Sequence, residues 1–384
     1  MGSSNDILSE DALHDPRIRS SIPWAEPRYW GNERRYVQDA MQSTWISGGP
    51  YVDRLETDLA SFVDVPEAVV TSNGTTAIHA AYLALDVRPG DEIIVPGFAY
   101  MAAANIALLM GAIPKFADVD LNTWCITAET IAAKVTSRTK GIVPIHTYGN
   151  VCDMAPILEF ANERGLWVLE DAAEALGSKY RGIAAGSVAS IGTYSFHATK
   201  TITTGEGGAV VTRDALLAER LRLFRSHGVS QRRYWHEVPG HNFRLTNIQA
   251  AIGCAQFERL SDIQRERDRV YETYKREFTD FAGVAMQAIT LHVEPLMWAV
   301  GIRLLPTHFR HGRDSVMQTL AAAGIETRPG FHAASEMASL YNAPSIPVAA
   351  QLAREIISLP SSPTVKNNEI RLIAEIVRNC CDIV

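Results

Sequence analysis

Short apolar runs alternate with stretches of helical periodicity over residues 68–212. Most runs are rich in β-branched residues and have the length of a buried strand, and the intervening stretches are mostly long enough for a helix. Strands separated by helices in this way indicate an α/β fold with a mostly parallel, seven-stranded-type sheet covered by helices. The predicted strands are 68–71, 91–96, 113–118, 141–145, 166–169, 191–196 and 208–212, and the predicted helices between them are 77–85, 101–110 and 156–164.

The two ends of the chain do not follow this alternation. Residues 1–22 open with polar and acidic positions, and helices are predicted after them at 32–41 and 51–62. Residues 245–281 read as one long helical element, and the segment beyond it has shorter elements and more prolines. We expect three parts, namely a flexible lead-in at 1–22, a large α/β domain at 23–270 and a smaller C-terminal α+β domain at 271–384.

The composition is that of an ordinary soluble enzyme. The 384 residues are 47% hydrophobic and 21% charged, and a net charge of −7 without a basic block argues against a nucleic-acid partner. The five cysteines are scattered, no Cys/His spacing indicates a metal site, and a reducing cytoplasm fits them best. We expect no membrane association, because the start lacks an apolar leader and the apolar stretch 100–114 is too short to span a bilayer.

Lys200 has the surroundings that pyridoxal 5'-phosphate (PLP) chemistry needs. It lies in a loop rich in Ser, Thr and Gly at 195–208, and Asp171 follows an apolar strand upstream. A lysine amine can form a Schiff base with the aldehyde of PLP, and a carboxylate can pair with the pyridinium nitrogen. A lone lysine in a polar loop is usually a solvated surface residue, and an aspartate here could be a helix N-cap. The pairing of Lys200 with Asp171 favours PLP binding in the large domain.

Further polar residues follow predicted strands. The small-residue turn 72–76 lies between a strand and a helix, where unpaired N–H groups and the helix dipole favour a phosphate. Tyr100 and Ser195 also lie at or just beyond strand ends. Because ligands bind at the carboxyl ends of parallel strands, one pocket can hold all of these residues together with Asp171 and Lys200.

Nine motifs in order give the chain a resemblance to the DegT/DnrJ/EryC1/StrS family. Its members are fold-type I, PLP-dependent sugar aminotransferases related to aspartate aminotransferase, and the resemblance covers residues 45–363. One motif is moderate evidence, but nine in order are specific. The motifs are Ser-Gly-Gly-Pro-Tyr (47–51), Ser-Asn-Gly-Thr-Thr-Ala (72–77), Val-Pro-Gly-Phe-Ala-Tyr (95–100), His-Thr-Tyr-Gly-Asn (146–150), Glu-Asp-Ala-Ala-Glu-Ala-Leu-Gly (170–177), Ser-Phe-His-Ala-Thr-Lys (195–200), Gly-His-Asn-Phe-Arg-Leu (240–245), Gly-Ile-Glu-Thr-Arg-Pro (324–329) and Ser-Leu-Pro-Ser-Ser (358–362).

The resemblance implies a role for each residue of the predicted pocket. Lys200 would form the internal aldimine and then shuttle a proton between the cofactor and the sugar carbon, which requires a lowered pKa. Asp171 would pair with the pyridinium, and Tyr100 would stack on the pyridine face. Asn242 would complete the phosphate site from the neighbouring subunit of an obligate homodimer with two shared active sites. The implied cofactor contacts are Gly74, Thr75, Tyr100, Asp171, Glu174, Ser195, Lys200 and Asn242.

Glu174 lies one turn beyond Asp171 on the same helix face. Many relatives carry glutamine there, near the phenolic oxygen of the cofactor. A glutamate would be a second carboxylate in a confined site, where one proton can be held, and a surface helix position is the alternative. A weaker set would contact the substrate, in competition with structural roles or surface pairing: Tyr51, His197, Arg244, Arg328 and His332.

Lysine at position 200 favours the aminotransferase branch, since a related branch has histidine there and removes a sugar hydroxyl. The run 200–208 with Glu174 most resembles the perosamine-synthase group, which moves the amino group of L-glutamate onto the C4 ketone of a nucleotide-linked 4-keto-6-deoxyhexose. Pyridoxamine 5'-phosphate would be the intermediate, and surface polysaccharide or glycoconjugate biosynthesis the setting. The alternatives are a 3-keto sugar or an eight-carbon keto-sugar acid as acceptor, a PLP-dependent dehydratase or eliminase, and a PLP-binding regulatory protein.

Overall fold

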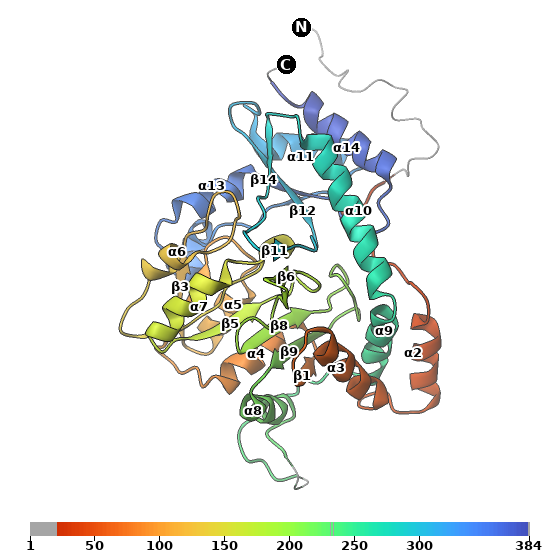
Figure 1. Cartoon of the computed structure of the whole chain (residues 1–384), viewed down its shortest axis with the longest axis vertical. Helices are drawn as coiled ribbons and strands as arrows, with labels where there is room; N and C mark the ends of the chain where they lie inside the picture. The colour runs from red at the N-terminus through yellow and green to blue at the C-terminus, as the bar shows by residue number, and fades with distance from the viewer. Residues whose placement is uncertain (1–20, 231, 233, 383–384) are drawn as a thin grey trace.

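The structure is a computed structural model that describes residues 21–230, 232 and 234–382 (Figure 1). Residues 1–20 of the expected lead-in lie outside this part. Its last residue, Ile22, is buried and forms a parallel bridge with Ile325. The Ile22 N–H donates to the Gly324 carbonyl at 2.8 Å. The described chain is therefore tied to its own C-terminal region from Ile22 onward.

The seven apolar runs form one seven-stranded sheet, as predicted. Its strand order is β1-β9-β8-β5-β4-β2-β3, and only β9 is antiparallel to its neighbours. Most positions in these strands are buried, which is why their sequences are nearly continuous apolar runs. The strands are β1 (Glu67–Thr71), β2 (Glu92–Pro96), β3 (Ile113–Ala117), β4 (Thr139–Ile142), β5 (Trp167–Asp171), β8 (Ile191–Ser195) and β9 (Gly208–Thr212).

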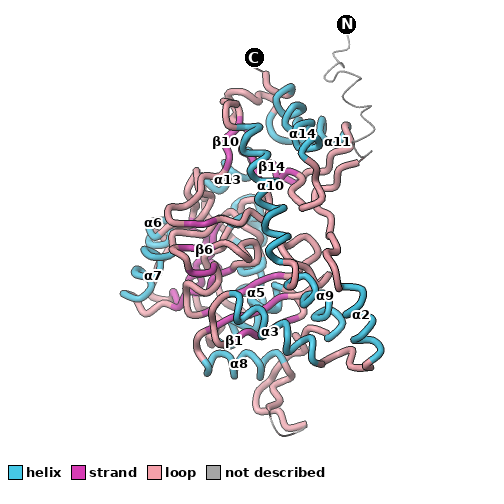
Figure 2. The backbone as a smooth tube through the Cα atoms, turned by 45° about the vertical axis from the view of Figure 1, so that its right-hand side comes forward, coloured by secondary structure: helices cyan, strands magenta, loops and turns pink. Residues whose placement is uncertain are grey.

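Helices pack on this sheet, as Figure 2 shows from a second side. The helix predicted from residue 77 begins at Gly74, because Asn73 caps it. The Asn73 side chain accepts from the Thr76 N–H at 2.9 Å, and the Thr76 hydroxyl accepts from the Asn73 N–H at 3.1 Å. The helices of this part are α2 (Glu33–Gln42), α3 (Pro50–Phe62), α4 (Gly74–Ala84), α5 (Ala102–Leu109), α6 (Ala128–Ala132), α7 (Met154–Glu163) and α8 (Ala215–Arg225).

The helical stretch expected at 245–281 is two helices rather than one, α9 (Asn247–Phe257) and α10 (Leu260–Phe278). The break falls at Glu258, whose carboxylate is held from outside the helix. It accepts hydrogen bonds from Asn32 and Arg54, both at 2.8 Å. These contacts tie the end of α9 to α2 and α3, so the chain turns there before α10 begins.

The C-terminal region builds a second core. Its four-stranded antiparallel sheet has the order β10-β12-β14-β13, and a small sheet β11-β6-β7 lies between it and the large sheet (Figure 1). No described helix is long and apolar enough to cross a membrane. The remaining elements are β6 (Lys179–Tyr180), β7 (Ile183–Ala184), β10 (Val284–Met286), β11 (Val293–Glu294), β12 (Val300–Leu304), β13 (Arg328–Pro329), β14 (Ile356–Leu359), α11 (Gly312–Ala322), α12 (Ala338–Tyr341), α13 (Pro347–Glu355) and α14 (Asn367–Asn379).

The chain passes from the first core to the second within α10. Leu260 and Ile263 are buried in the core of the large sheet, whereas Val270 and Tyr274 are buried in the C-terminal core. The domain boundary predicted at residue 270 stays a prediction. In addition, Trp298 and its neighbours return from the C-terminal region to pack in the first core.

Gly149 lies where this returning segment meets the large sheet. Its φ is +107°, and a Cβ there would lie 2.3 Å from the Leu296 carbonyl oxygen. The adjacent Tyr148 carbonyl accepts from the Trp298 N–H at 2.9 Å. Only glycine allows this close contact of two backbones.

We predict that Gly149→Ala lowers the free energy of unfolding by about 3 kcal/mol, through left-handed strain and overpacking together. Gly165→Ala is the matched control, because Gly165 has a φ of +62° and nothing within 4 Å of its Cβ position. That variant should lose only about 1 kcal/mol, from strain alone. Denaturant unfolding of both variants checks this, and equal losses would contradict the proposed backbone contact.

Candidate active site

Three strands end together at one edge of the large sheet. Thr71 of β1 and Ser195 of β8 both pair with Gly208 of β9, and Asp171 of β5 pairs with Thr193 of β8. Because β9 is antiparallel to both neighbours, the carboxyl ends of β1, β8 and β5 lie on the same side. The register therefore brings the turn after β1, Ser195 and Asp171 to one edge, where ligands of such sheets bind.

The turn that starts α4 has the shape of a phosphate cradle. A Cβ on Gly74 would lie 2.9 Å from the Ser195 Cβ, so only glycine lets the helix start this close to β8. Gly208 provides a second close approach, since a Cβ there would lie 2.5 Å from the Asn73 carbonyl. Among the described residues, no acceptor is found for the N–H groups of Gly74 and Thr75. Two free donors at a helix start, beside a serine hydroxyl, fit a phosphate group.

Lys200 is buried beside this edge. Its side chain is 13% exposed, and its Nζ lies 3.4 Å from Oε1 of Glu174 and 3.6 Å from the centroid of the Trp298 ring. Burial lowers the pKa of Lys200, while the charges of Glu174 and Asp171 oppose this and that of Arg267 adds to it. An amine with a lowered pKa can accept and return a proton near neutral pH.

Asp171 presents a buried carboxylate at the end of β5. One of its oxygens accepts from the Ala173 N–H at 3.0 Å. Burial raises the pKa of Asp171, and the Ala173 N–H and Lys200 act in the opposite direction. A cationic partner would hold such a carboxylate ionised, as a protonated pyridine nitrogen does. With Lys200 and the phosphate cradle, these residues fit PLP.

Behind Asp171 lies a fully buried pair. Nε2 of His146 is 2.9 Å from Glu170, and its Nδ1 accepts from the Cys152 N–H at 3.3 Å. Because Nδ1 accepts, the proton of the neutral ring lies on Nε2 and is donated to Glu170. This pair supports β5 from inside the sheet, so His146 has a structural role.

Glu174 is a second buried carboxylate at the site. One oxygen faces Lys200, and the other accepts from the Tyr148 N–H at 2.9 Å. Tyr148 has a φ of +61°, a left-handed conformation that points its N–H at the carboxylate. Burial raises the pKa of Glu174, Lys200 lowers it and Asp171 raises it. The predicted confined pair of carboxylates is thus present around one amine.

Tyr100 and Asn242 lie at the surface of the single chain. The Tyr100 ring is 66% exposed. Asn242 is exposed, and its Oδ1 accepts from Arg244 at 3.0 Å. The neighbouring Phe243 carbonyl accepts from the Ser72 N–H at 2.7 Å, so this segment runs beside the phosphate turn. The contacts of Tyr100 and Asn242 with a cofactor stay predictions.

Two of the candidate substrate-binding residues, Tyr51 and His197, form hydrogen bonds with neighbouring side chains. The Tyr51 hydroxyl donates to Asp39 at 2.9 Å, and burial together with Asp39 raises the pKa of Tyr51 to about 12. His197 lies close to Lys200 in sequence and pairs its Nδ1 with the Thr199 hydroxyl at 3.0 Å. Neither contact excludes a substrate role, which stays a prediction for both.

The other three residues of that set are exposed: Arg244 bonds to Asn242, whereas Arg328 and His332 each face a carboxylate. Arg328 pairs with Glu326 at 2.5 Å, and its guanidinium lies 5.6 Å from the centroid of the Trp24 ring. His332 lies 3.1 Å from Glu336. Trp24 in turn packs edge-on against Trp298 at 5.8 Å, which links Arg328 to the surroundings of Lys200.

Sequence reasoning missed two residues that contact Lys200. Trp298 covers its amine, and Arg267 donates to its carbonyl at 2.9 Å. Arg267 was detectable, because it falls in the apolar stripe of α10 between Ile263 and Val270, where a charge is unusual. Trp298 stands in an apolar run before β12, and nothing in the sequence separates it from an ordinary core residue.

The fold and this site define a PLP-dependent transaminase of fold-type I. The family model described as "DegT/DnrJ/EryC1/StrS aminotransferase family" matches residues 29–378. A GDP-perosamine synthase of Caulobacter vibrioides is 44% identical over 81% of this chain and 84% of that protein, and one of Escherichia coli O157:H7 is 40% identical over 92% and 97%. The crystal structure of the aminotransferase TlmJ from Streptoalloteichus hindustanus matches with a TM-score of 0.89 and 29% identity, over 94% of this chain and 98% of that one. The chain belongs to the DegT/DnrJ/EryC1/StrS aminotransferase family.

Glu174→Gln should shift the pH at which the visible absorbance of the bound cofactor titrates to a lower value. The reason is that the Glu174 charge raises the pKa of Lys200, and glutamine removes that charge. Absorbance titration of the purified holoprotein measures the shift. Glu163→Gln is the control, because Glu163 is 62% exposed and pairs with Arg164, its neighbour in the chain. An identical titration of both variants would mean that Glu174 does not act on the amine.

Proposed function

We propose that this enzyme moves the amino group of L-glutamate onto the C4 ketone of a GDP-linked 4-keto-6-deoxyhexose, as a step in making an amino sugar for a surface polysaccharide or glycoconjugate. The observation that carries the proposal is the buried amine of Lys200, 3.4 Å from Glu174, at the sheet edge where Asp171 ends β5. Relatives named GDP-perosamine synthase support the choice of sugar and nucleotide.

In both half-reactions, residues of this chain would transfer protons and hold the cofactor. When bound, PLP supplies the electron sink that makes a carbon–hydrogen bond next to nitrogen acidic. Nζ of Lys200 takes the proton from the α-carbon of glutamate and, in the second half, delivers a proton to C4 of the sugar. Asp171 holds the ring nitrogen protonated, and the start of α4 with Ser195 anchors the phosphate. Trp298 packs its ring 3.6 Å from the Lys200 amine, and the burial of that amine lowers its pKa.

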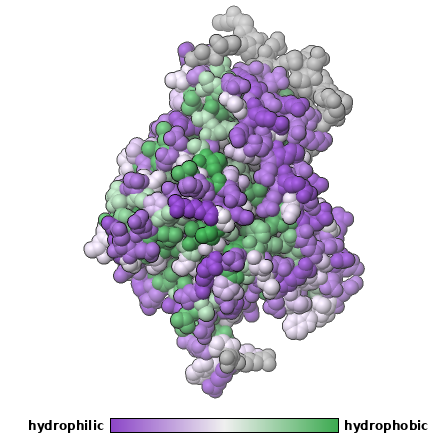
Figure 3. Space-filling view, viewed as in Figure 1, coloured by the Kyte–Doolittle hydropathy of each residue, from purple (hydrophilic) through white to green (hydrophobic). Residues whose placement is uncertain are grey.

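A homodimer with shared active sites fits the surface of the chain. Trp45 and Tyr100 are 64% and 66% exposed, and Figure 3 shows apolar residues gathered on the middle of one face, beside the hydrophilic band of α10. Exposed apolar area of this kind is typical of protein–protein contact. In the proposed dimer Asn242 of one subunit completes the phosphate site of the other. None of the five cysteines, all of which lie in the described residues, forms a disulfide bond, which suits the reducing cytoplasm that we propose as its location.

The first experiment is a visible spectrum of the holoprotein before and after L-glutamate. The yellow band should bleach, and addition of GDP-4-keto-6-deoxymannose should restore it with formation of an amino sugar. UDP- and dTDP-linked 4-keto sugars, a 3-keto sugar and an eight-carbon keto-sugar acid are the comparison acceptors. A band that glutamate leaves unchanged would refute the donor, and a preferred comparison acceptor would refute the sugar.

Lys200→Ala should reduce kcat by at least roughly a thousandfold, because it removes the amine that we propose moves the proton. Lys275→Ala is the control, since Lys275 is exposed in the last turn of α10 and its amine pairs with Glu272 at 3.6 Å. Steady-state assay of both variants measures the difference. Comparable activity of the two would remove Lys200 from the reaction.

The shared site can be tested by mixing two defective subunits. Asn242→Asp puts a negative charge against the phosphate, so this variant and Lys200→Ala should each be nearly inactive alone. Random reassortment makes half of the dimers mixed, each with one intact site of two, so activity should recover to about a quarter of the wild-type value. If Asn242 serves its own chain instead, the mixture will stay inactive.

A further inference from the structure

Arg267 is a buried cation on α10 without an acidic partner. The residue is 4% exposed, and no ion pair of its guanidinium is found among the described residues. Burial lowers the pKa of Arg267 to about 10, which still leaves it protonated at neutral pH. A buried charge without a counter-ion is costly, and proteins retain such a group where its hydrogen bonds or its field are needed.

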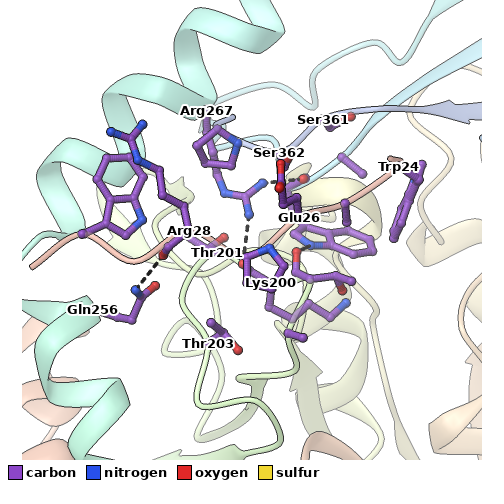
Figure 4. A pocket seen from close by; sticks show the side chains of 18 residues that line it. Trp24, Glu26, Arg28, Lys200, Thr201, Thr203, Gln256, Arg267, Ser361 and Ser362 are labelled. Carbon is purple, nitrogen blue, oxygen red and sulfur yellow. Dashed lines mark hydrogen bonds between the residues drawn. The ribbon is translucent and has the colours of Figure 1, made fainter. Parts of the chain in front are cut away.

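The guanidinium is used to hold two main-chain carbonyls. One terminal nitrogen donates to the Lys200 carbonyl at 2.9 Å, and the other donates to the Trp298 carbonyl at 2.7 Å. The planar fork of arginine joins the two segments at a fixed spacing, which lysine cannot do. Figure 4 shows both bonds, with Arg267 reaching down from α10 to the Lys200 loop.

Trp298 completes a closed arrangement around the lysine. Its indole N–H donates to the Thr199 carbonyl at 2.6 Å, and its ring lies 3.6 Å from Nζ of Lys200. Two consecutive carbonyls of the lysine loop, at Thr199 and Lys200, are therefore held by donors from outside the loop. The clamp formed by Arg267 and Trp298 fixes both the backbone of Lys200 and the ring above its amine.

A small cavity lies on the backbone side of this clamp. It has a volume of about 30 Å³, and its walls include Arg267, Thr201 and Trp24. Nε of Arg267 and the Thr201 hydroxyl are buried without a hydrogen-bond partner among the described residues. The space is enough for roughly two water molecules, and Glu26 also lines it, so this cavity brings one carboxylate to the backbone side of the clamp.

The field of Arg267 reaches the amine of Lys200. Four charged groups define the surroundings of that amine: its own protonated form, Glu174 and Asp171 from the end of β5, and Arg267 from α10. Arg267 is the one cation among the three neighbours, and it opposes the protonation that the two carboxylates favour. Substitution of Arg267 can therefore change both the electric field at the Lys200 amine and the hydrogen bonds that hold the Lys200 loop. The two effects can be separated.

We propose that Arg267 is a positioning residue for amino transfer: it clamps the carbonyls of Lys200 and Trp298 so that the lysine amine is held beneath the indole ring, and its uncompensated charge keeps that amine available as a base. This inference rests on the proposed role of Lys200. It assigns Arg267 no contact with substrate or cofactor. Its action is through the loop and the electric field.

Two substitutions separate the two effects. Arg267→Met removes the charge and the clamp, so the visible band of the holoprotein should titrate at a higher pH than in the wild type, and kcat should fall by roughly ten- to a hundredfold. Arg267→Lys keeps the charge but not the fork, so kcat should fall while the band titrates as in the wild type. KM for glutamate should change little in either variant, because Arg267 does not touch the substrate.

Arg269 supplies the matched control, because it lies on the same helix and also holds main-chain carbonyls. Its guanidinium donates to Val365 at 2.8 Å and to Pro363 at 3.3 Å, away from the lysine loop. Arg269→Met should leave the titration of the band and kcat unchanged. If Arg267→Met and Arg269→Met lower kcat equally and neither moves the titration, Arg267 is merely structural and the proposal is wrong.

Two further measurements cover the cases in which Arg267→Met does not fold or Lys200 is not the lysine that holds PLP. If Arg267→Met does not fold, the Arg267→Lys variant decides alone, because wild-type kcat in that variant overturns the clamp. Borohydride reduction followed by peptide mapping of the wild type identifies the lysine that holds PLP. A label at another residue would overturn the proposed role of Lys200 and this inference together, whereas a label at Lys200 without bleaching by glutamate would refute only the amino donor.

Discussion

The site depends on one constraint, which is that the Lys200 amine is buried beside the Glu174 carboxylate and within the field of the Asp171 carboxylate. Burial disfavours the charged amine and both charged carboxylates, attraction between the amine and each carboxylate favours their charged forms, and Asp171 opposes the charge of Glu174. These opposing effects lower the pKa of Lys200 and raise those of Asp171 and Glu174, which favours proton exchange at the site. The rest of the structure keeps this balance: β5 delivers Asp171, the Tyr148 N–H fixes Glu174, and the Trp298 ring excludes water from the amine.

Glycine and backbone contacts, more than long side chains, determine how closely the parts of the site approach. Gly74 brings the start of α4 onto Ser195, Gly208 brings β9 under the same turn, and Gly149 brings the Leu296 carbonyl against the large sheet. In each case a single methyl group would push the segments apart. The phosphate cradle and the cover over Lys200 are therefore set by main-chain geometry, which is rigid and tolerates little substitution.

The sequence predicted the sheet well because its strands are buried on both faces and read as apolar runs. It also placed Asp171, Ser195 and Lys200 at strand ends, which the register of β5, β8 and β9 brings together. It did not predict the break at Glu258, because the cause is a set of contacts from distant helices. Trp298 was equally hidden, since a tryptophan that covers an amine and one that fills a core look alike in sequence. Helix propensity and periodicity carry no information on such long-range partners.

The helix α10 connects the two cores of the molecule as one continuous element. It has 19 residues, so it is about 28 Å long, and it is buried in the large-sheet core at one end and the C-terminal core at the other. Arg267 lies near its middle, at the changeover between the cores. A small rotation of the C-terminal core about the first would swing this rigid rod, and the guanidinium would carry the Lys200 carbonyl with it. A displacement of α10 would therefore be transmitted to the backbone of Lys200 through this hydrogen bond.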